Sequence, residues 1–197
     1  MPDSTFRWFA LALLITAIGL SGFHRRRART GSETIARSRE RAPLIAGRLL
    51  VALPFLAGTL AYILNPAWMA WGSLEIPVWL RWIGVGLGVA VVPAVHWVLS
   101  SLGKNVSETV LTKRDHQLVQ HGPYRWVRHP LYTTGTTMLF ALGLMAASWF
   151  LLTLATLALV LIRLVVVPIE EGELTRRFGA GYTTYMSHSG AMLPRLR

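Results

Sequence analysis

Two short stretches of the chain carry the side chains that could do chemistry. The first, residues 116–132, reads His-Gln-Leu-Val-Gln-His-Gly-Pro-Tyr-Arg-Trp-Val-Arg-His-Pro-Leu-Tyr and concentrates histidine, arginine and tyrosine. The second begins with two adjacent carboxylates, Glu170 and Glu171. Imidazole, guanidinium and carboxylate groups together can hold a small charged ligand through charge-assisted hydrogen bonds. A binding site that uses both stretches requires them to meet in space.

Two prolines shape the first stretch. Proline cannot continue a helical hydrogen-bond ladder, and it biases the residue before it away from helical backbone angles. Gly122-Pro123 and His129-Pro130 therefore predict turns on either side of a short rigid segment.

Apolar and aromatic residues follow the glutamates at helical spacing. Leu174, Phe178, Tyr182 and Tyr185 are three or four residues apart, which predicts that they share one broad helical face. The glutamates stand where an apolar segment ends, and carboxylates near a helix C-terminus are unfavourable unless a partner compensates them or the helix continues to Phe178. The candidate partners are a cationic ligand group or the side chains of Arg128, His129 and Arg163.

Several other chemistries lack their motifs. The chain has no cysteine, which excludes a thiolate nucleophile and a cysteine metal site. It contains no Walker loop, no G-x-G-x-x-G fingerprint, no G-x-S-x-G and no H-E-x-x-H. His116, His121 and His129 do not have the spacing of zinc ligands, and we predict no metal site.

The composition indicates that membrane helices must position these residues. Of the 197 residues 53% are hydrophobic and 15% are charged, against about 25% charged in soluble domains, and the mean hydropathy is +0.45. Apolar runs in lipid must satisfy their own backbone, so we predict an all-α, polytopic helical bundle. Five spans are expected, at Phe6–Gly22, Leu44–Asn65, Trp79–Leu102, Leu131–Ala147 and Trp149–Ile169.

The chain is short enough for a single membrane domain, residues 1–197. Three N-terminal spans occupy residues 1–102, and residues 103–197 hold a ligand-binding loop, a helical hairpin and the C-terminal tail. The first span is interpreted as retained and not as a signal peptide, because its basic cluster follows the apolar run.

Three residues inside the predicted spans have expected roles of their own. Gly135 and Gly143 on the fourth span would permit close helix packing. His96 lies inside the third span, where a histidine is a functional candidate by default; a hydrogen-bonded structural role is the favoured interpretation.

Basic residues predict the orientation. The net charge is +11, and sixteen of the twenty Lys and Arg residues lie in segments 23–43, 103–130 and 170–197. The positive-inside rule then puts the N-terminus outside and the C-terminus in the cytoplasm, with both candidate stretches on the cytoplasmic face of the cell membrane. This distribution favours a membrane partner over nucleic acid.

Residues 100–194 resemble the superfamily of isoprenylcysteine carboxyl methyltransferases and phospholipid methyltransferases. The motifs that carry the resemblance keep their order, spacing and membrane context. They are Leu102-Gly103-x-Asn105, His116-x-Leu118-Val119, Gly122-x-Tyr124, Arg128-His129-Pro130-x-Tyr132, Glu170-Glu171-x-x-Leu174-x-x-x-Phe178-Gly179-x-x-Tyr182-x-x-Tyr185 and Pro194.

The resemblance implies an integral membrane methyltransferase with S-adenosyl-L-methionine as methyl donor. By position it implies a donor pocket lined by His116, Leu118, Val119, Tyr124, Arg128, His129, Pro130, Leu131, Tyr132, Glu170 and Glu171. Arg128 or His129 would hold the donor carboxylate, and Glu170 its ammonium or ribose. Tyrosine rings would pack on the adenine or face the sulfonium. No dedicated nucleophile is expected, because methyl transfer depends mainly on placement.

The acceptor side departs from the carboxyl-methylating relatives. Val166 stands where they carry a basic residue, and Ala191 where some of them carry an arginine. Arg163, one turn before Val166, is the candidate acceptor-side residue. The expected acceptor is lipid-borne or hydrophobic: an isoprenylcysteine-like carboxylate, a phospholipid amine or a thiol. The alternatives are an NADPH-dependent membrane reductase related to sterol reductases and a non-enzymatic membrane protein.

Overall fold

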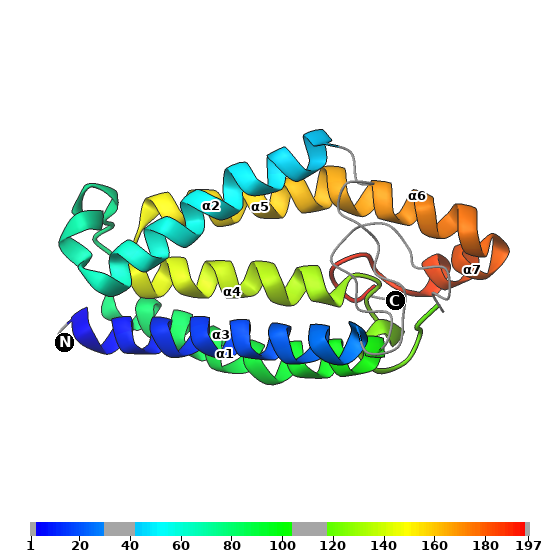
Figure 1. The fold of residues 1–197 in the computed structure, drawn as a ribbon, viewed down its shortest axis with the longest axis horizontal. Coiled ribbons are helices and arrows are strands. Elements are labelled where there is room, and N and C mark those ends of the chain that lie inside the picture. Colours follow the sequence, from blue (N-terminus) through cyan, green and yellow to red (C-terminus); the bar gives the residue numbers. More distant parts are fainter. Residues whose placement is uncertain (1–2, 30–41, 104–117, 196–197) are drawn as a thin grey trace.

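Long helices run side by side along most of the molecule (Figure 1). The structure, a computed structural model, describes residues 3–29, 42–103 and 118–195. Its helices are α1 (Asp3–Arg29), α2 (Ala42–Leu64), η2 (Pro66–Gly72), α3 (Val78–Leu102), η4 (Gly122–Arg125), α4 (Pro130–Ala146), α5 (Trp149–Leu161), η5 (Ile162–Val166), α6 (Val167–Phe178) and α7 (Ala180–His188).

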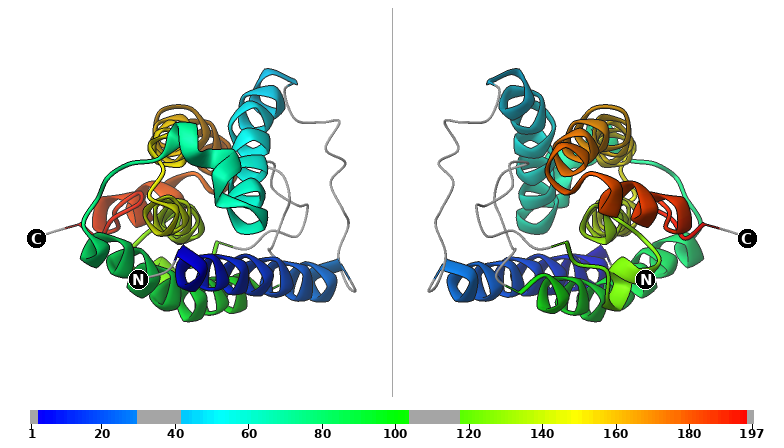
Figure 2. Two further views of the ribbon diagram at one scale, coloured as in Figure 1. Left: turned by 90° about the vertical axis from the view of Figure 1, so that its left-hand side faces the viewer. Right: turned by 90° about the vertical axis from the view of Figure 1, so that its right-hand side faces the viewer.

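The predicted spans are present as helices. Four segments of the described chain are long and apolar enough to cross a bilayer, namely Asp3–Ala28, Leu44–Leu64, Val78–Leu102 and Trp149–Phe178. The remaining predicted span, α4, has 17 residues, at the lower limit of about 17–25 for a crossing helix. Helix α4 lies in the middle of the bundle, with α1 and α3 on one side and α2 and α5 on the other (Figures 1 and 2). Its neighbours therefore cover it on both sides.

Small residues allow α3 and α4 to approach closely. A Cβ atom added to Gly84 would lie 2.8 Å from the Ala141 carbonyl oxygen, so a larger residue there would push the two helices apart. Gly143 is equally constrained, with Leu152 of α5 at 2.8 Å from such a Cβ. The prediction for Gly143 is confirmed. For Gly135 it is wrong, because no atom lies within 4 Å of its added Cβ.

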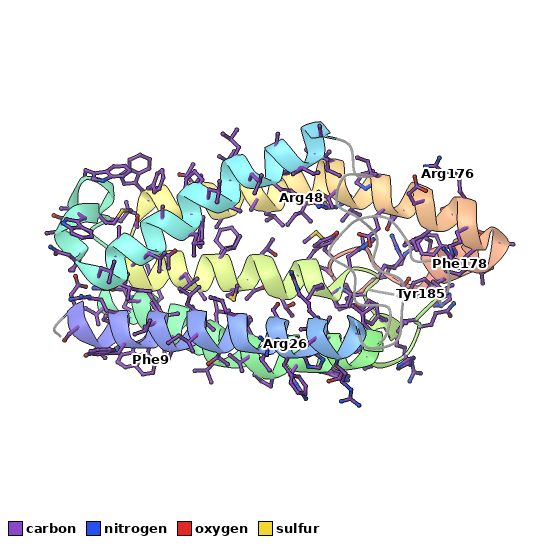
Figure 3. All side chains as sticks on the ribbon, viewed as in Figure 1. Phe9, Arg26, Arg48, Arg176, Phe178 and Tyr185 are labelled. Carbon is purple, nitrogen blue, oxygen red and sulfur yellow. The ribbon has the colours of Figure 1, made fainter. Side chains whose placement is uncertain are left out.

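Apolar side chains cover the outside of the bundle as well as its core (Figure 3). The main core cluster includes Phe6, Phe55, Met145 and Leu151. Leucines and isoleucines on the outer helix faces remain exposed, among them Leu50 at 75% and Leu164 at 67%. An exposed apolar surface of this kind matches hydrocarbon and not water, which agrees with a membrane protein.

The two ends of the bundle differ in character. At the tryptophan end, which comprises residues 65–77 and 147–149, exposed Trp68, Trp71 and Trp149 surround η2 and the α4–α5 turn. At the carboxylate end, which comprises residues 118–129 and 170–195, η4, α6 and α7 gather (Figure 1). Both candidate stretches therefore lie at one end of the bundle, as a shared site requires.

Two boundaries differ from the predictions. Helix α1 continues to Arg29, so the basic residues Arg25, Arg26 and Arg27 extend the helix instead of starting a polar connection. The last span continues through a π-turn, η5, into α6 and ends at Phe178, past both glutamates. Of the two alternatives for the glutamates, the continuation of the helix to Phe178 is the one that the structure has, so Glu170 and Glu171 do not lie at a helix C-terminus.

The intramembrane histidine of α3 has a partner on another helix. His96 Nδ1 lies 3.3 Å from His24 Nε2 of α1. The expected hydrogen bond of His96 is confirmed, and it links α1 to α3 near the carboxylate end.

Candidate functional site

The segment from Gly122 to Pro130 forms a hook that leads into α4. Gly122 has φ +59°, a left-handed conformation that glycine adopts without strain, and η4 follows it directly. His129 is non-helical, with φ −122° and ψ 56°, and Pro130 occupies the first turn of α4. Both predicted proline turns are confirmed, and they fix the direction of the side chains between them.

The C-terminal segment holds this hook in place by backbone pairing. The Arg128 amide donates to the Gly190 carbonyl at 2.8 Å, and the His129 amide donates to the Ala191 carbonyl at 2.9 Å. The Thr133 hydroxyl donates to the Met192 carbonyl at 2.5 Å. This role of the C-terminal segment was not predicted from the sequence. The pairing requires a glycine at 190, because a Cβ there would collide with the Leu193 carbonyl oxygen.

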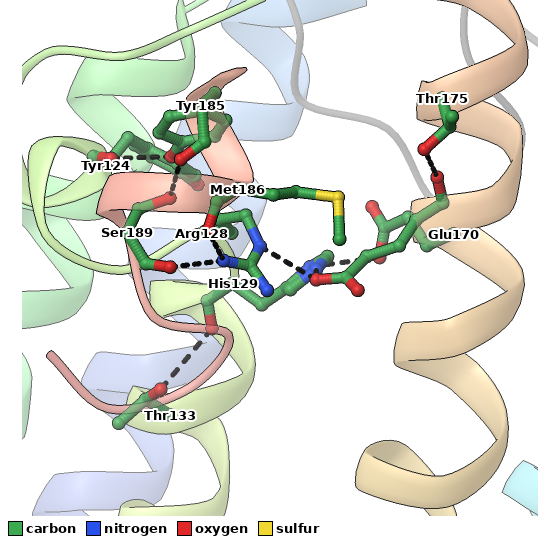
Figure 4. A network of polar contacts seen from close by, with 10 residues as sticks. Tyr124, Arg128, His129, Thr133, Glu170, Thr175, Tyr185, Met186 and Ser189 are labelled. Atoms are coloured by element: carbon green, nitrogen blue, oxygen red, sulfur yellow. Dashed lines mark hydrogen bonds and ion pairs between the residues drawn. The ribbon is translucent and has the colours of Figure 1, made fainter. Parts of the chain in front are cut away.

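Four charged side chains meet where the hook faces α6 (Figure 4). His129 Nε2 lies 3.3 Å from Glu171 Oε1, and His129 Nδ1 lies 3.5 Å from Glu170 Oε2. Arg128 Nε donates to the same Glu171 oxygen at 2.8 Å. Two of the three predicted glutamate partners, Arg128 and His129, are therefore in place across more than forty residues of sequence.

The arginine of this network also binds the C-terminal helix. Arg128 Nη1 donates to the Met186 carbonyl at 3.3 Å and to the Ser189 carbonyl. Its Nη2 makes no hydrogen bond to the residues described. Arg128 thus joins the hook, α6 and the end of α7, and keeps the two N–H groups of Nη2 for another acceptor.

The histidine is buried between two carboxylates. Burial alone lowers the pKa of His129, but polar contacts with Glu170 and Glu171, together with their negative charge, raise it above the ordinary value. A protonated His129 would be positively charged and would neutralise part of the charge of the pair.

Aromatic side chains form the wall behind this network. Tyr182 and Tyr185 of α7 pack with Leu174 of α6 and with Leu118. Tyr185 donates its hydroxyl to the Tyr124 carbonyl at 2.5 Å. The prediction of one shared helical face is wrong, because Gly179 (φ +52°) ends α6 and turns the chain back. The residues still meet, since α7 packs against α6.

Burial affects the tyrosine hydroxyls of this wall. It raises the pKa of Tyr185 to about 12 and that of Tyr124 and Tyr182 further still. All three remain neutral hydrogen-bonding groups at physiological pH.

Two buried oxygens of the site lack a hydrogen bond. Within the described parts of the chain, Glu170 Oε2 and the Tyr182 hydroxyl have no hydrogen-bond partner. Buried polar atoms are normally satisfied, so such atoms are informative. Here they mark positions where a ligand with N–H or O–H groups would complete the network.

The other predicted donor-site residues lie at different distances from this network. The Tyr132 ring stacks on His129, with centroids 5.7 Å apart. Pro130 is buried at the start of α4, and Val119 is half-buried next to Leu118. Leu131 packs on Leu99 and Ala28 instead of the network. His116 lies outside the described residues.

Two cavities flank α4 on opposite sides. An apolar cavity of about 430 Å³ lies between α2, α4 and α5, and Tyr132, Arg48 and Val166 are among its lining residues. A second cavity of about 560 Å³ is lined by three threonines of α4, Arg163 and the C-terminal residues 191–193. Arg163 thus lines the second cavity, whereas Tyr132 lines the apolar one. The role of Arg163 towards the acceptor stays a prediction.

Comparison with known proteins agrees with this geometry. The family description of phospholipid methyltransferases matches residues 79–181, just over half of the chain, and this range contains the hook and both glutamates. The chain belongs to the phospholipid methyltransferase family.

A solved structure supports the fold, and one curated protein is similar to a short part of the chain. The eukaryotic intramembrane Ras methyltransferase ICMT, isoprenylcysteine carboxyl methyltransferase, has a similar structure, with a TM-score of 0.56 and 21% identity. The match covers 79% of this chain and 53% of ICMT. The uncharacterized protein YpbQ of Bacillus subtilis (strain 168) is 36% identical over 52 residues, which are 26% of this chain and 31% of YpbQ.

Proposed function

We propose that this protein transfers a methyl group from S-adenosyl-L-methionine to a lipid-borne or hydrophobic acceptor. Membership of the phospholipid methyltransferase family supports the reaction class. The observation that carries the proposal is the convergence of Glu170 and Glu171 of α6 with His129 of the hook, next to an apolar cavity inside the bundle.

The chemistry of the side chains fits this donor. Its ammonium and ribose hydroxyl groups need acceptors, and Glu170 Oε2 and the Tyr182 hydroxyl are buried oxygens of the site that make no hydrogen bond with the described residues. Its carboxylate needs a cation, for which Arg128 Nη2 and His129 are the candidates. Its sulfonium would be attracted by a tyrosine face, as Tyr124 and Tyr132 offer at the two ends of the hook.

The remaining residues of the predicted set would close the pocket. We assign Leu118, Val119 and Pro130 to its apolar surroundings and Glu171 to holding Arg128 in place. Leu131, which packs on Leu99 and Ala28, belongs to the proposed set by resemblance alone. His116 belongs to the proposed set by resemblance.

The acceptor would reach the donor through the apolar cavity. Tyr132 lines this cavity and stacks on His129, so the cavity ends beside the polar network. Val166, fully buried, lies one turn before Glu170 and lines the same cavity. Such a lining suits an acyl or prenyl chain, and the reacting group would be a phospholipid amine, a thiol or an isoprenylcysteine-like carboxylate.

Catalysis would rest on placement. When bound, the donor supplies an electrophilic methyl group, and no side chain needs to form a covalent bond. The chain's contribution is to fix the donor between the hook and α6, to exclude water by the tyrosine wall and to align the acceptor from the bilayer. Effective placement of two reactants alone contributes about 7–11 kcal/mol to lowering a barrier.

The orientation of the protein in the membrane belongs to the same proposal. The distribution of Lys and Arg supports a cytoplasmic carboxylate end and an external N-terminus in the cell membrane. The water-soluble donor would then enter from the cytoplasm.

Donor binding is the decisive test. We expect saturable calorimetric binding of S-adenosyl-L-methionine and its demethylated product to protein in lipid nanodiscs, and none of NADPH. Labelled methyl transfer should then be measured on extracted lipids, prenylated cysteine analogues and small thiols. Binding of NADPH without binding of the sulfonium donor would replace the proposal with a reductase.

A further inference from the structure

The second cavity differs chemically from the apolar one. Its lining comes from Thr133, Thr136 and Thr137 of α4, from Arg163 of η5 and from residues 191–193. The three threonines lie on one face of α4, and Tyr132 and Met138, which line the apolar cavity, lie on the other face. The two cavities therefore open on opposite faces of α4 and take different ligands.

Arg163 occupies an unusual depth for a charged residue. It lies 14 residues after Trp149 of the tryptophan end, about 21 Å along a helix at about 1.5 Å per residue. Glu170 lies 21 residues after Trp149, about 32 Å, which matches the hydrocarbon thickness of about 30 Å. The Cα atom of Arg163 is thus placed inside the hydrocarbon layer, where a charged side chain needs a partner.

The described residues provide no partner for this guanidinium. In the described ranges Arg163 makes no hydrogen bond and no ion pair, although its side chain is exposed to the cavity. By contrast, Arg81, in the first turn of α3, has several partners. An anion from outside the chain would supply what Arg163 lacks.

The threonines of the cavity indicate which kind of anion would bind there. Each of the three donates its hydroxyl hydrogen to a backbone carbonyl: Thr133 to Met192, Thr136 to Tyr132 and Thr137 to Thr133. Their oxygens keep lone pairs that can accept. The cavity therefore offers one cation together with hydrogen-bond acceptors, beside the apolar side chains of Phe140, Leu159 and Leu193.

We propose that this cavity binds the head group of a membrane phospholipid, with the phosphate on Arg163. Head-group hydroxyls such as those of phosphatidylglycerol would donate to the threonine oxygens, and one acyl chain would lie along the apolar wall. The site is distinct from the acceptor cavity, and it does not depend on the proposed methyl transfer.

Occupation of this site would brace the hook. Thr133 and residues 191–192 line the cavity, and the same residues hold the hook through the Thr133–Met192 and His129–Ala191 hydrogen bonds. A lipid bound there would favour the arrangement in which these bonds are formed. Because a ligand stabilises the state that it binds, the lipid should raise the melting temperature.

The test is a binding titration of delipidated protein in detergent with short-chain phosphatidylglycerol, with phosphatidylcholine as comparison. We expect tighter binding of phosphatidylglycerol, and Arg163→Gln should weaken it about tenfold, as expected for loss of a charge-assisted contact. Arg163→Lys should restore part of the affinity. Arg176→Gln removes the same charge from an exposed position on α6 and should leave binding unchanged.

Leu159→Trp provides a second variant that keeps the charge. The larger side chain would fill the cavity, so it should abolish lipid binding even if Arg163→Gln does not fold.

Equal losses for Arg163→Gln and Arg176→Gln would overturn the proposal, as would unchanged binding in Leu159→Trp. A defect of Arg163→Gln confined to the KM for the methyl acceptor would also overturn it and would assign Arg163 to the acceptor. Failure of the methyl transfer proposal would leave these binding results unaffected.

Discussion

An arginine near each end of the bundle joins several helices, and the two arginines differ in how completely the polar groups around them are hydrogen-bonded. At the tryptophan end, Arg81 of α3 donates to the Met145 carbonyl at 2.9 Å and to the Tyr62 hydroxyl at 2.9 Å. It also pairs with Asp3 at 2.5 Å and lies over the Phe6 ring at 4.0 Å. This cluster joins α1, α2, α3 and α4.

At the carboxylate end, Arg128 makes a similar set of bonds but in a network that is not closed. It joins the hook, α6 and α7, while Glu170 Oε2 and the Tyr182 hydroxyl, in the described chain, keep unused hydrogen-bonding capacity. A cluster that satisfies its own members stabilises a fold. One that leaves buried oxygens unsatisfied can take up a ligand that satisfies them. The comparison predicts opposite effects of mutation at the two ends.

The largest effect on stability is expected from Arg81→Met. The methionine keeps apolar contact with Phe6 but removes the guanidinium donor of the Tyr62 hydroxyl and the guanidinium bonds to the Met145 carbonyl, which keeps only the Tyr62 hydroxyl as donor, at 3.2 Å. The free energy of unfolding should fall by about 2–4 kcal/mol. The half-exposed Asp3 adds little to this value, since exposed ion pairs are weak. Thermal unfolding in detergent measures the loss. Donor affinity measured well below the melting temperature should not change, and a parallel loss of affinity would show that the two ends are coupled.

Glu170→Gln should have the reverse profile. It replaces a charged acceptor by a neutral one, so donor affinity should fall by about 1.5–3 kcal/mol, roughly 10- to 150-fold. Stability should change by less than about 1 kcal/mol, because the only contact of Glu170 Oε2 with a charged group of the described residues is the long, 3.5 Å pair with His129, which keeps Glu171 as a second carboxylate partner. Calorimetry measures the affinity. Glu173→Gln, on the same helix and paired with Arg176, is the matched control. An unchanged affinity in Glu170→Gln would remove this residue from the donor site.

The contribution of His129 should depend on pH. Its raised pKa means that folding favours the protonated ring, so the stabilisation is complete below the unfolded pKa of about 6.5. It is lost as the pH rises through the raised folded value. The stability difference between wild type and His129→Gln should therefore shrink in thermal unfolding as the pH rises above about 6.5. A difference that grows with pH would mean that His129 is held in its neutral form.

The smallest effects on stability are expected when either of two neighbouring tyrosines of α7 loses its hydroxyl group. Tyr185→Phe removes the hydrogen bond to the Tyr124 carbonyl, which should cost about 1 kcal/mol of stability. Tyr182→Phe removes a buried hydroxyl that bonds no described residue, so stability should stay equal or rise slightly, while donor affinity falls. Unfolding and calorimetry of both variants test this. Equal behaviour of the two would mean that the Tyr182 hydroxyl is not a ligand position.

Local patterns were enough to predict most of the helices. Membrane-length apolar runs can satisfy their backbone in lipid as helices, so the first three spans were predicted to within about three residues at most of their ends. The proline turns at Gly122 and His129 were also predictable, because proline restricts the backbone of the residue directly before it. The exit of α1 and the end of the last span were not, because a polar residue can extend a helix into water as easily as end it.

The geometry of the site came from contacts between distant segments. Residue types indicated that Arg128 and His129 are partners for the glutamates, but their distances depend on the pairing of residues 189–192 with the hook, which leaves no local pattern. The glycine at 179 bends the chain so that Tyr182 and Tyr185 return to Leu174, where a continuous helix would have carried them away. The separation of Arg163 from Tyr132 into two cavities likewise follows from how α4 packs against α5. Backbone chemistry acts within a few residues and can be read along the chain, whereas packing and ion pairing join residues far apart and exist only in the folded bundle.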